Sequence, residues 1–273
     1  SIVIGLTLGS FGNDGVKFLP NLLQSSWSVI IKAALSGVIF NIANYLLVAA
    51  ITITGMAVAF PIGIGIALAL GTSLSYIVSP KGNPYLLFIG MLLILIAVVL
   101  DGRVYQRSFV SKNKTGKGIV IAVISGIFMS LFYPLLSESM IGHFSLSPYS
   151  ALCIFSLGIV LCHAILSPIF MKKPLTGKEL TFRRYRLGNI RQHCYGLLGG
   201  GIWCIGTSFN LIAQTRTGPG VAFAFGQGAT LIAAVWGVFI WQEFKNAKKV
   251  NLLLSFMFCS YILGLCFIVF SSR

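Results

Sequence analysis

A series of long apolar runs constrains this chain more than any other feature. Each complete run is close to the 20 or so residues that an α-helix needs to cross a membrane. Only 9% of the 273 residues are charged and 56% are hydrophobic, so a water-soluble domain of this length would lack a polar surface. The sequence therefore predicts an all-α fold, a polytopic membrane helix bundle.

The apolar runs give the expected positions of the membrane spans. We expect a partial span at residues 2–12, followed by eight complete spans near residues 29–51, 55–78, 84–101, 118–137, 147–171, 194–214, 219–241 and 250–270. About nine spans are thus expected in this chain. Because Ser1 opens inside an apolar run without a charged leader, we also expect a further segment to precede it.

Basic residues gather in three of the connecting loops. The loops 101–118, 172–193 and 242–249 hold 15 of the 20 Lys and Arg residues, and two crossings separate each loop from the next. The positive-inside rule predicts that these loops are cytoplasmic and that the C-terminus lies outside, with the plasma (inner) membrane as the location. We expect the basic loops to contact anionic lipid headgroups of the bilayer. Nucleic acid is not expected as a partner, because the charge is confined to loops between spans.

A short repeat relates the two halves of the chain. The segments Gly55–Gly65 and Gly218–Gly228 are identical at six of eleven positions, with a constant offset of 163 residues. Five crossings separate the copies, so they point in opposite directions through the membrane. Inverted repeats of this kind are typical of secondary transporters. The repeat predicts a 5+5 inverted-repeat transporter fold whose first helix is missing from this chain, with residues 1–114 as the first repeat and 115–273 as the second.

Polar residues deep in the spans are the candidate binding residues, because each is costly in lipid unless it faces the bundle interior or water. An amide offers both a donor and an acceptor, and an indole or phenol adds an apolar platform. A proline inside a span predicts either a kink or a break that lines a cavity. The predicted solute-binding residues are Asn41, Asn44, Pro61, Tyr133, Trp203, Asn210 and Gln227. The alternative for each is an interhelical contact that holds the bundle together.

No pattern in the sequence indicates an enzyme. The HExxH, GxSxG and phosphate-binding motifs are absent, and the six cysteines form no CxxC pair. We therefore expect no catalytic residues, no metal site and no cofactor. None of the five acids lies at mid-depth of a predicted span, and Asp14 and Glu138 come closest. A proton carried by one of these, a proton carried by a residue outside this chain, and uncoupled transport all stay open. The oligomeric state is not predicted.

Three segments carry a resemblance to known transporters. They are Gly37–Asn44, Gly199–Gly206 and Gly218–Glu243. The last of them overlaps the run from Trp236 to Phe244, which resembles a helix that closes with a glutamate. Together with the repeat, they resemble the drug/metabolite transporter superfamily. Within it, the chain looks most like the ureide permease-like branch, which adjoins the bacterial glucose/ribose and rhamnose porters. The resemblance covers the chain from the second family helix onward.

The resemblance implies a ten-helix permease that works by alternating access. Its implied solute is a small polar metabolite, a ureide such as allantoin or a related purine- or pyrimidine-type heterocycle, with the proton as a candidate coupling ion. A monosaccharide porter of the same superfamily is the alternative. A non-transporting membrane scaffold is the alternative from another class of protein.

Overall fold

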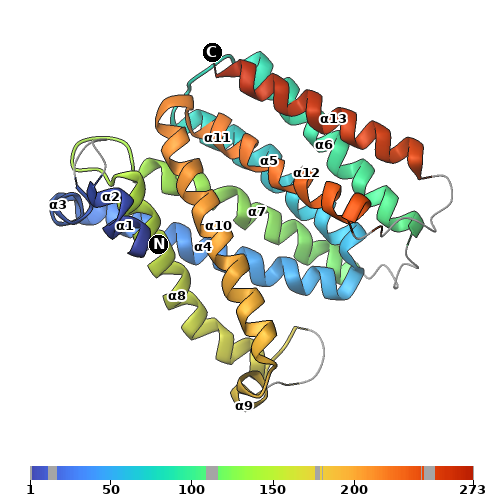
Figure 1. Ribbon diagram of the computed structural model, residues 1–273, viewed down its shortest axis with the longest axis horizontal. Helices are drawn as coiled ribbons and strands as arrows, with labels where there is room; N and C mark the ends of the chain where they lie inside the picture. The colour runs from blue at the N-terminus through green and yellow to red at the C-terminus, as the bar shows by residue number, and fades with distance from the viewer. Residues whose placement is uncertain are drawn as a thin grey trace. The chain divides into compact units, whose positions relative to one another are not determined.

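The computed structural model describes residues 2–11, 17–108, 116–175, 179, 181–240, 242 and 250–272. Eight of its helices are long and apolar enough to span a membrane, which confirms the predicted polytopic helical bundle (Figure 1). No strand occurs among the described residues. The elements are α1 (Ile2–Leu6), α2 (Leu8–Phe11), α3 (Phe18–Gln24), α4 (Trp27–Thr54), α5 (Met56–Val78), α6 (Pro84–Ser108), α7 (Gly116–Glu138), α8 (Pro148–Lys172), α9 (Phe182–Arg186), α10 (Ile190–Thr217), α11 (Pro219–Gly226), α12 (Gly228–Val235), the π-helical turn η1 (Trp236–Ile240) and α13 (Asn251–Ser271).

The ends of the helices differ from the limits of the apolar runs. The predicted partial span at 2–12 is two short helices, α1 and α2, which are interrupted at Thr7. The hydroxyl of Thr7 donates to the carbonyl of Val3 over 2.7 Å. The long helices, in contrast, continue past the apolar residues, as α10 does by beginning at Ile190. Hydropathy marks the part of a helix that lies in lipid, whereas polar residues extend the same helix beyond it.

By packing, the chain forms two compact units. Unit 1 comprises Ser1–Asn41 and Leu135–Ala213, and unit 2 comprises Ile42–Pro134 and Gln214–Arg273. The boundaries fall inside α4, α7 and α10, so each unit takes residues from both predicted repeats. The predicted boundary between residues 114 and 115 separates two sequence repeats, whereas the units are defined by packing. The division into repeats stays a prediction.

In unit 2, α6 and α13 lie side by side (Figure 1). They meet at a pair of glycines: a Cβ built on Gly90 would lie 2.7 Å from the carbonyl oxygen of Gly264, and one built on Gly264 would lie 2.8 Å from that of Gly90. Glycine lets two backbones approach this closely, which matters where lipid supplies no hydrophobic drive for packing. The buried core around the crossing joins α5, α6 and α13, and includes Leu68, Leu87, Ile94, Met257, Tyr261 and Ile268.

The two copies of the repeat begin α5 and α11 in the same backbone conformation. Gly55 precedes α5 with φ 84° and ψ 158°, and Gly218 precedes α11 with φ 89° and ψ 155°. Residues with a Cβ are strained at such positive φ values, so both turns require glycine. The matching glycines of the repeat therefore have a structural reason at this position.

The helices that follow these two glycines pack against each other in opposite directions. Gly220 of α11 contacts Tyr76 near the end of α5, and the ring of Phe223, one turn further along α11, contacts Gly71 one turn earlier in α5. As the residue number rises along α11, the number of the contacting residue in α5 falls, so the two helices are antiparallel. This is the opposed orientation that the crossing count predicts for the two copies.

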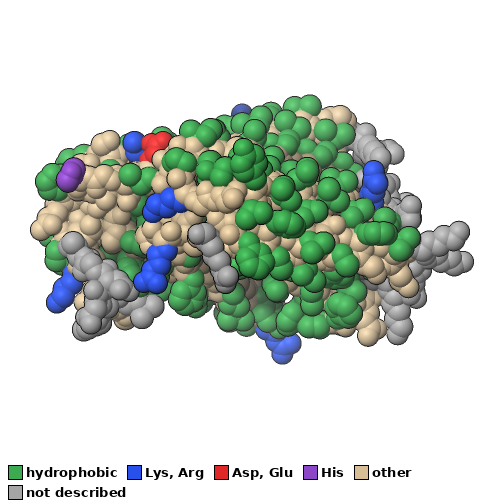
Figure 2. All heavy atoms as spheres, turned by 90° about the horizontal axis from the view of Figure 1, so that it is seen from above, with side chains coloured by type: hydrophobic (Ala, Val, Ile, Leu, Met, Phe, Trp, Pro, Cys, Tyr) green, Lys and Arg blue, Asp and Glu red, His purple; other side chains and the backbone are tan. Residues whose placement is uncertain are grey.

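Many large apolar side chains are exposed on the surface. Figure 2 shows hydrophobic side chains over much of the face in view, with few Lys and Arg among them. Exposed apolar residues recur along single helices, for example Leu92, Ile96 and Val99 on α6. Exposed apolar surface on this scale is expected where a helix faces lipid.

We predict that Gly90→Ala destabilises the protein by about 1–3 kcal/mol, because the new methyl group would press on the backbone of α13. The matched control is Gly200→Ala in α10, where a Cβ meets no described atom within 4 Å. Both substitutions replace a glycine inside a helix, so they share the same gain in helix propensity. Thermal unfolding in detergent should show a lower Tm for Gly90→Ala alone. Equal Tm values for the two variants would contradict a close crossing at Gly90.

Candidate functional site

Asn41 stands out among the predicted binding residues. It lies in unit 1 near the middle of α4 and is 8% exposed. Its amide nitrogen Nδ2 is buried and has no hydrogen-bond partner in the described structure. An amide nitrogen carries two N–H donors, and a buried donor without a partner costs about 1–3 kcal/mol. This nitrogen can therefore donate a hydrogen bond to an acceptor on a bound solute.

An aromatic cluster begins at the residue next to Asn41 and joins three helices of unit 1. The rings of Phe40 on α4 and Trp203 on α10 are stacked, with centroids 5.2 Å apart and planes 22° apart. Phe155 on α8 completes the cluster, 5.5 Å from Phe40 and 6.2 Å from Trp203. Phe155 is fully buried, whereas Trp203 is 42% exposed. The exposed indole offers an apolar platform on which a further flat ring can stack.

The helix that carries Trp203 has polar residues on the same face. Thr207 and Asn210 follow Trp203 at i+4 and i+7, which places all three on one side of α10. The hydroxyl of Thr207 donates to the carbonyl of Trp203 over 2.9 Å, and Asn210 is partly buried. A Cβ built on Gly199 or Gly206 would meet no described atom within 4 Å. Packing thus does not explain these two glycines, and the space beside Trp203 is open.

The seven predicted residues are divided between the two units. Asn41, Trp203 and Asn210 belong to unit 1, where Phe40 links the helix of Asn41 to Trp203. The other four, Asn44, Pro61, Tyr133 and Gln227, belong to unit 2. Their joint role in one solute site stays a prediction.

Tyr133 lies in the interior of unit 2. It is 4% exposed, and its ring centroid is 5.0 Å from that of Phe223 in the second copy of the repeat. The ring of Phe132 also approaches Phe223, at 6.1 Å. These contacts hold α7 against α11. They are interhelical contacts, the alternative to solute binding that the sequence left open for Tyr133.

The sequence left two alternatives for Pro61, a kink or a break in the helix, and the structure has no break at this residue. The helix α5 continues from Met56 to Val78 with Pro61 inside it. The proline is the sixth residue of this helix, so it removes one backbone hydrogen bond near the helix start. Ala224 stands at the equivalent position of the second copy.

The backbone break instead occurs at Gln227, between α11 and α12. The Gln227 N–H donates to the carbonyl of Ala224 over 3.2 Å, and the Thr230 N–H donates to the carbonyl of Gln227 over 3.0 Å. Hydrogen bonds three residues apart replace the four-residue spacing of an α-helix. Gly226 and Gly228 flank the break, and glycine is a poor helix former. Irregular backbone at membrane depth is tolerated where it is buried in protein or lines a cavity.

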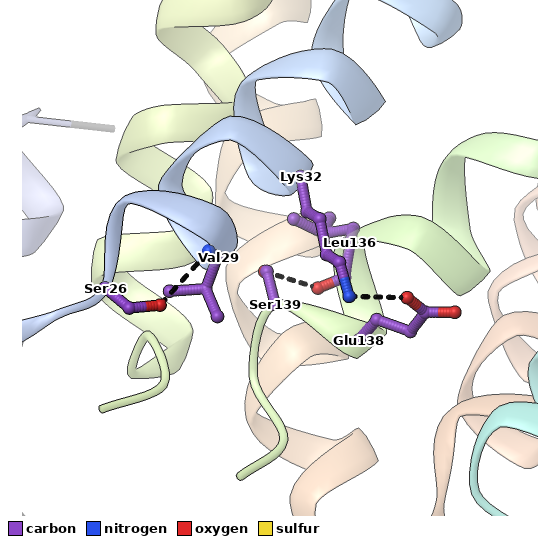
Figure 3. A network of polar contacts seen from close by, with 6 residues as sticks. All are labelled: Ser26, Val29, Lys32, Leu136, Glu138 and Ser139. Atoms are coloured by element: carbon purple, nitrogen blue, oxygen red, sulfur yellow. Dashed lines mark hydrogen bonds and ion pairs between the residues drawn. The ribbon is translucent and has the colours of Figure 1, made fainter. Parts of the chain in front are cut away.

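An ion pair joins two helices of unit 1 at one end of the bundle. Lys32 Nζ on α4 lies 2.9 Å from Glu138 Oε2, at the last residue of α7 (Figure 3). The two side chains are 40% and 42% exposed. The chain reverses direction directly after Glu138, where the Ser139 hydroxyl donates to the carbonyl of Leu136 over 2.6 Å. The pair thus connects α4 to the end of α7 at a point that solvent reaches.

The sequence did not indicate the contacts of three of these residues. Phe40 and Phe155 lie within apolar runs, and no local pattern signals that they meet Trp203. Lys32 did carry a signal, because a cation inside an apolar run needs a partner. Asp14, the other acid considered as a proton carrier, lies outside the described residues.

Comparison with known proteins places this chain among membrane transporters. The family described as sugar transport protein matches residues 2–270. Ureide permease 1 of Arabidopsis thaliana is 22% identical over 336 residues, which cover 100% of this chain and 86% of the relative. The putative sugar uptake protein YxfA of Lactococcus lactis subsp. lactis (strain IL1403) is 23% identical over 262 residues, covering 90% of this chain and 81% of the relative. No solved structure matches.

We predict that the Lys32–Glu138 pair contributes up to about 1 kcal/mol of stability, because both side chains are partly exposed to solvent. Lys32→Glu alone should lower Tm by roughly 2–4 °C, since it places two carboxylates together. The double variant Lys32→Glu/Glu138→Lys reverses the pair and should recover most of that loss. Thermal unfolding in detergent over the full double-mutant cycle measures the coupling. Strictly additive effects of the two reversals would show that the pair contributes nothing.

Proposed function

The chain belongs to the sugar transport protein family and is a multi-pass integral membrane transporter, and on this premise we propose that its solute is a ureide such as allantoin or a related purine- or pyrimidine-type heterocycle. The proposed mechanism is secondary transport by alternating access between the two repeats. The plasma membrane is the proposed location, with the three basic loops cytoplasmic and the C-terminus outside.

The observation that carries the proposal is the buried amide nitrogen of Asn41, which has no hydrogen-bond partner in the described structure. Asn41 directly follows Phe40, whose ring stacks on Trp203. The Nδ2 donor matches a carbonyl oxygen, which every ureide and most oxidised purines and pyrimidines present. The indole of Trp203, which stacks on Phe40, matches the flat face of such a molecule, because aromatic rings prefer offset stacking on one another. One residue thus recognises the edge of the solute and the other recognises its face.

The charge of the spans supports a neutral solute. None of the five acids lies at mid-depth of a span, and Lys32 is paired with Glu138 near one end of the bundle. A charged solute would need a compensating charge in the membrane interior, since an unpaired ion there is costly. The amide nitrogen of Asn41, which is buried without a partner in the described structure, instead offers a donor to a neutral, hydrogen-bonding molecule.

A monosaccharide is the second candidate solute. The family description and the Lactococcus lactis relative favour it, because both are named for sugars. A sugar presents hydroxyl groups on all sides, so it needs several polar side chains around it, and it has no flat conjugated face to continue the Phe40–Trp203 stack. For this reason we place it behind the heterocycle.

Glu138 is the proposed carrier if protons drive the transport. Its carboxylate is partly exposed and is held by Lys32, so protonation would release the link between α4 and the end of α7. A protonophore distinguishes this coupled mechanism from uncoupled transport.

We expect cells that express the full-length protein to take up labelled allantoin or uracil faster than control cells, with unlabelled glucose failing to compete. A protonophore should lower the uptake if the proton is the coupling ion. Measuring labelled allantoin, uracil and glucose in parallel tests the choice of solute. Uptake of glucose alone would establish the sugar alternative. Uptake of none of them by stable, inserted protein would overturn the proposed solute and favour the scaffold alternative.

Asn41→Ala should raise the KM for the transported solute about ten-fold, because a lost hydrogen bond of about 1.4 kcal/mol corresponds to that factor. The Tm should not fall as it would if the amide held two helices together, since Nδ2 has no partner to lose. Ser36→Ala is the matched control: this buried hydroxyl of the same helix donates to the carbonyl of Ala33, so uptake should be unchanged. An unaltered KM in Asn41→Ala would remove Asn41 from the site.

A further inference from the structure

A tight turn in unit 1 folds α9 back against the start of α10 (Figure 1). The Gly188 N–H donates to the carbonyl of Tyr185 over 3.0 Å and ends α9. The side-chain oxygen of Asn189 then accepts from the Arg191 N–H, also over 3.0 Å, and starts α10. An asparagine in this position caps a helix by pairing one of its free N–H groups. Only three residues therefore separate the two helices.

A hollow of about 640 Å³ lies between the two helices. The imidazole of His193 stands edge-on to the ring of Tyr185, with centroids 5.1 Å apart. It also packs over Gly188, where a Cβ would lie 3.1 Å from His193 Nε2. These contacts fix the imidazole in the wall of the hollow. The residues that line it are Arg184, Tyr185, Gly188, Gln192, His193, Gly196 and Leu197.

The polar groups of this lining are suited to an anion. Arg184 supplies a guanidinium with five donors, and Gln192 and His193 add an amide and an imidazole. Among the described residues, no carboxylate lines the hollow. The first turn of the 28-residue helix α10 lies in the same wall, and a helix N-terminus attracts negative charge. The surrounding segment 172–193 has seven Lys and Arg residues against one acid, Glu179.

We propose that this hollow binds the phosphate of an anionic membrane lipid. Arg184 forms paired hydrogen bonds to two phosphate oxygens, the geometry in which a guanidinium binds phosphate most strongly. Gln192 and His193 donate to the remaining oxygens from the first turn of α10. The site is separate from the aromatic cluster at Trp203, which lies further along the same helix.

The position of the hollow in the chain selects a lipid over a soluble phosphate. The helix α10 is itself a candidate membrane span, so the lining passes within two turns from basic residues to Gly196 and Leu197. Leu197 is 80% exposed, and Leu187 of the turn is 75% exposed. Exposed leucines at the rim of a phosphate site would contact acyl chains, whereas a soluble phosphate leaves them in water. A lipid whose headgroup lies in the hollow and whose acyl chains lie along the rim would contact both the basic lining and the exposed leucines.

Native mass spectrometry of the full-length protein in detergent, titrated with phosphatidylglycerol, tests the site. Arg184→Gln should weaken the tightest phosphatidylglycerol binding about ten-fold. The matched control is Arg183→Gln, which removes the same charge from the same short helix but does not touch the hollow. It should change the binding less than two-fold. Phosphatidylcholine, which has no net charge, should bind equally to both variants and to the unaltered protein.

Gln192→Leu serves as a second variant, because it removes a donor from the hollow without changing the net charge. It should weaken phosphatidylglycerol binding several-fold in a protein of unchanged Tm. Equal losses in Arg183→Gln and Arg184→Gln, with none in Gln192→Leu, would reduce the effect to diffuse attraction and overturn the site. Inorganic phosphate that binds as tightly as phosphatidylglycerol would overturn the assignment to a lipid, because the acyl chains would then contribute nothing. None of these measurements depends on the transported solute.

Discussion

Close contact between helix backbones is the interaction on which this fold depends. In lipid, two helices gain almost nothing by burying apolar surface against each other, because the lipid tails are as apolar as the side chains. Packing must then come from dispersion forces, which act only at short range. The glycine pair Gly90 and Gly264 brings the backbones of α6 and α13 to that range, and a Cβ at either position would press on the opposite carbonyl. The large buried residues of unit 2 are arranged around this crossing.

A fold held in this way has little tolerance for polar groups without partners. Three buried side-chain atoms in the described structure have none: Asn41 Nδ2 and the hydroxyls of Thr72 and Ser75. They are not equivalent. A hydroxyl on a helix can rotate to bond the carbonyl of the preceding turn of the same helix, as Thr54 does with Ala50. The amide nitrogen of Asn41 carries two donors and makes no hydrogen bond in the described structure, so it is the group that we propose a solute satisfies.

The sequence predicts those parts of the structure that depend on a local pattern of residues, without contacts between distant segments. The long apolar runs predict the eight spans, because lipid selects for them along each helix. The repeat and the crossing count predict that α5 and α11 run in opposite directions, and the matching glycines Gly55 and Gly218 both adopt positive φ. The contacts that sequence reasoning misses require two distant residues to meet. Phe40 reaches Trp203, and Lys32 reaches Glu138, through packing that no local pattern encodes.

The two repeat copies are identical at some positions and differ at others, and this difference distinguishes structural positions from functional ones. An inverted repeat in which the copies are identical would present two equal half-sites, whereas a small solute without two-fold symmetry can use each contact only once. The residues that keep the fold must therefore match between copies, and the residues that touch the solute must diverge. The first glycines and the VAF run match, and they begin the helices and pack them together. Pro61 and Ala224 differ, as do Ile64 and Gln227, and the helix is continuous at the first of these positions but broken at the last. At Gln227 the two copies differ in sequence and the helix is interrupted. For both reasons Gln227 stays among the proposed solute contacts.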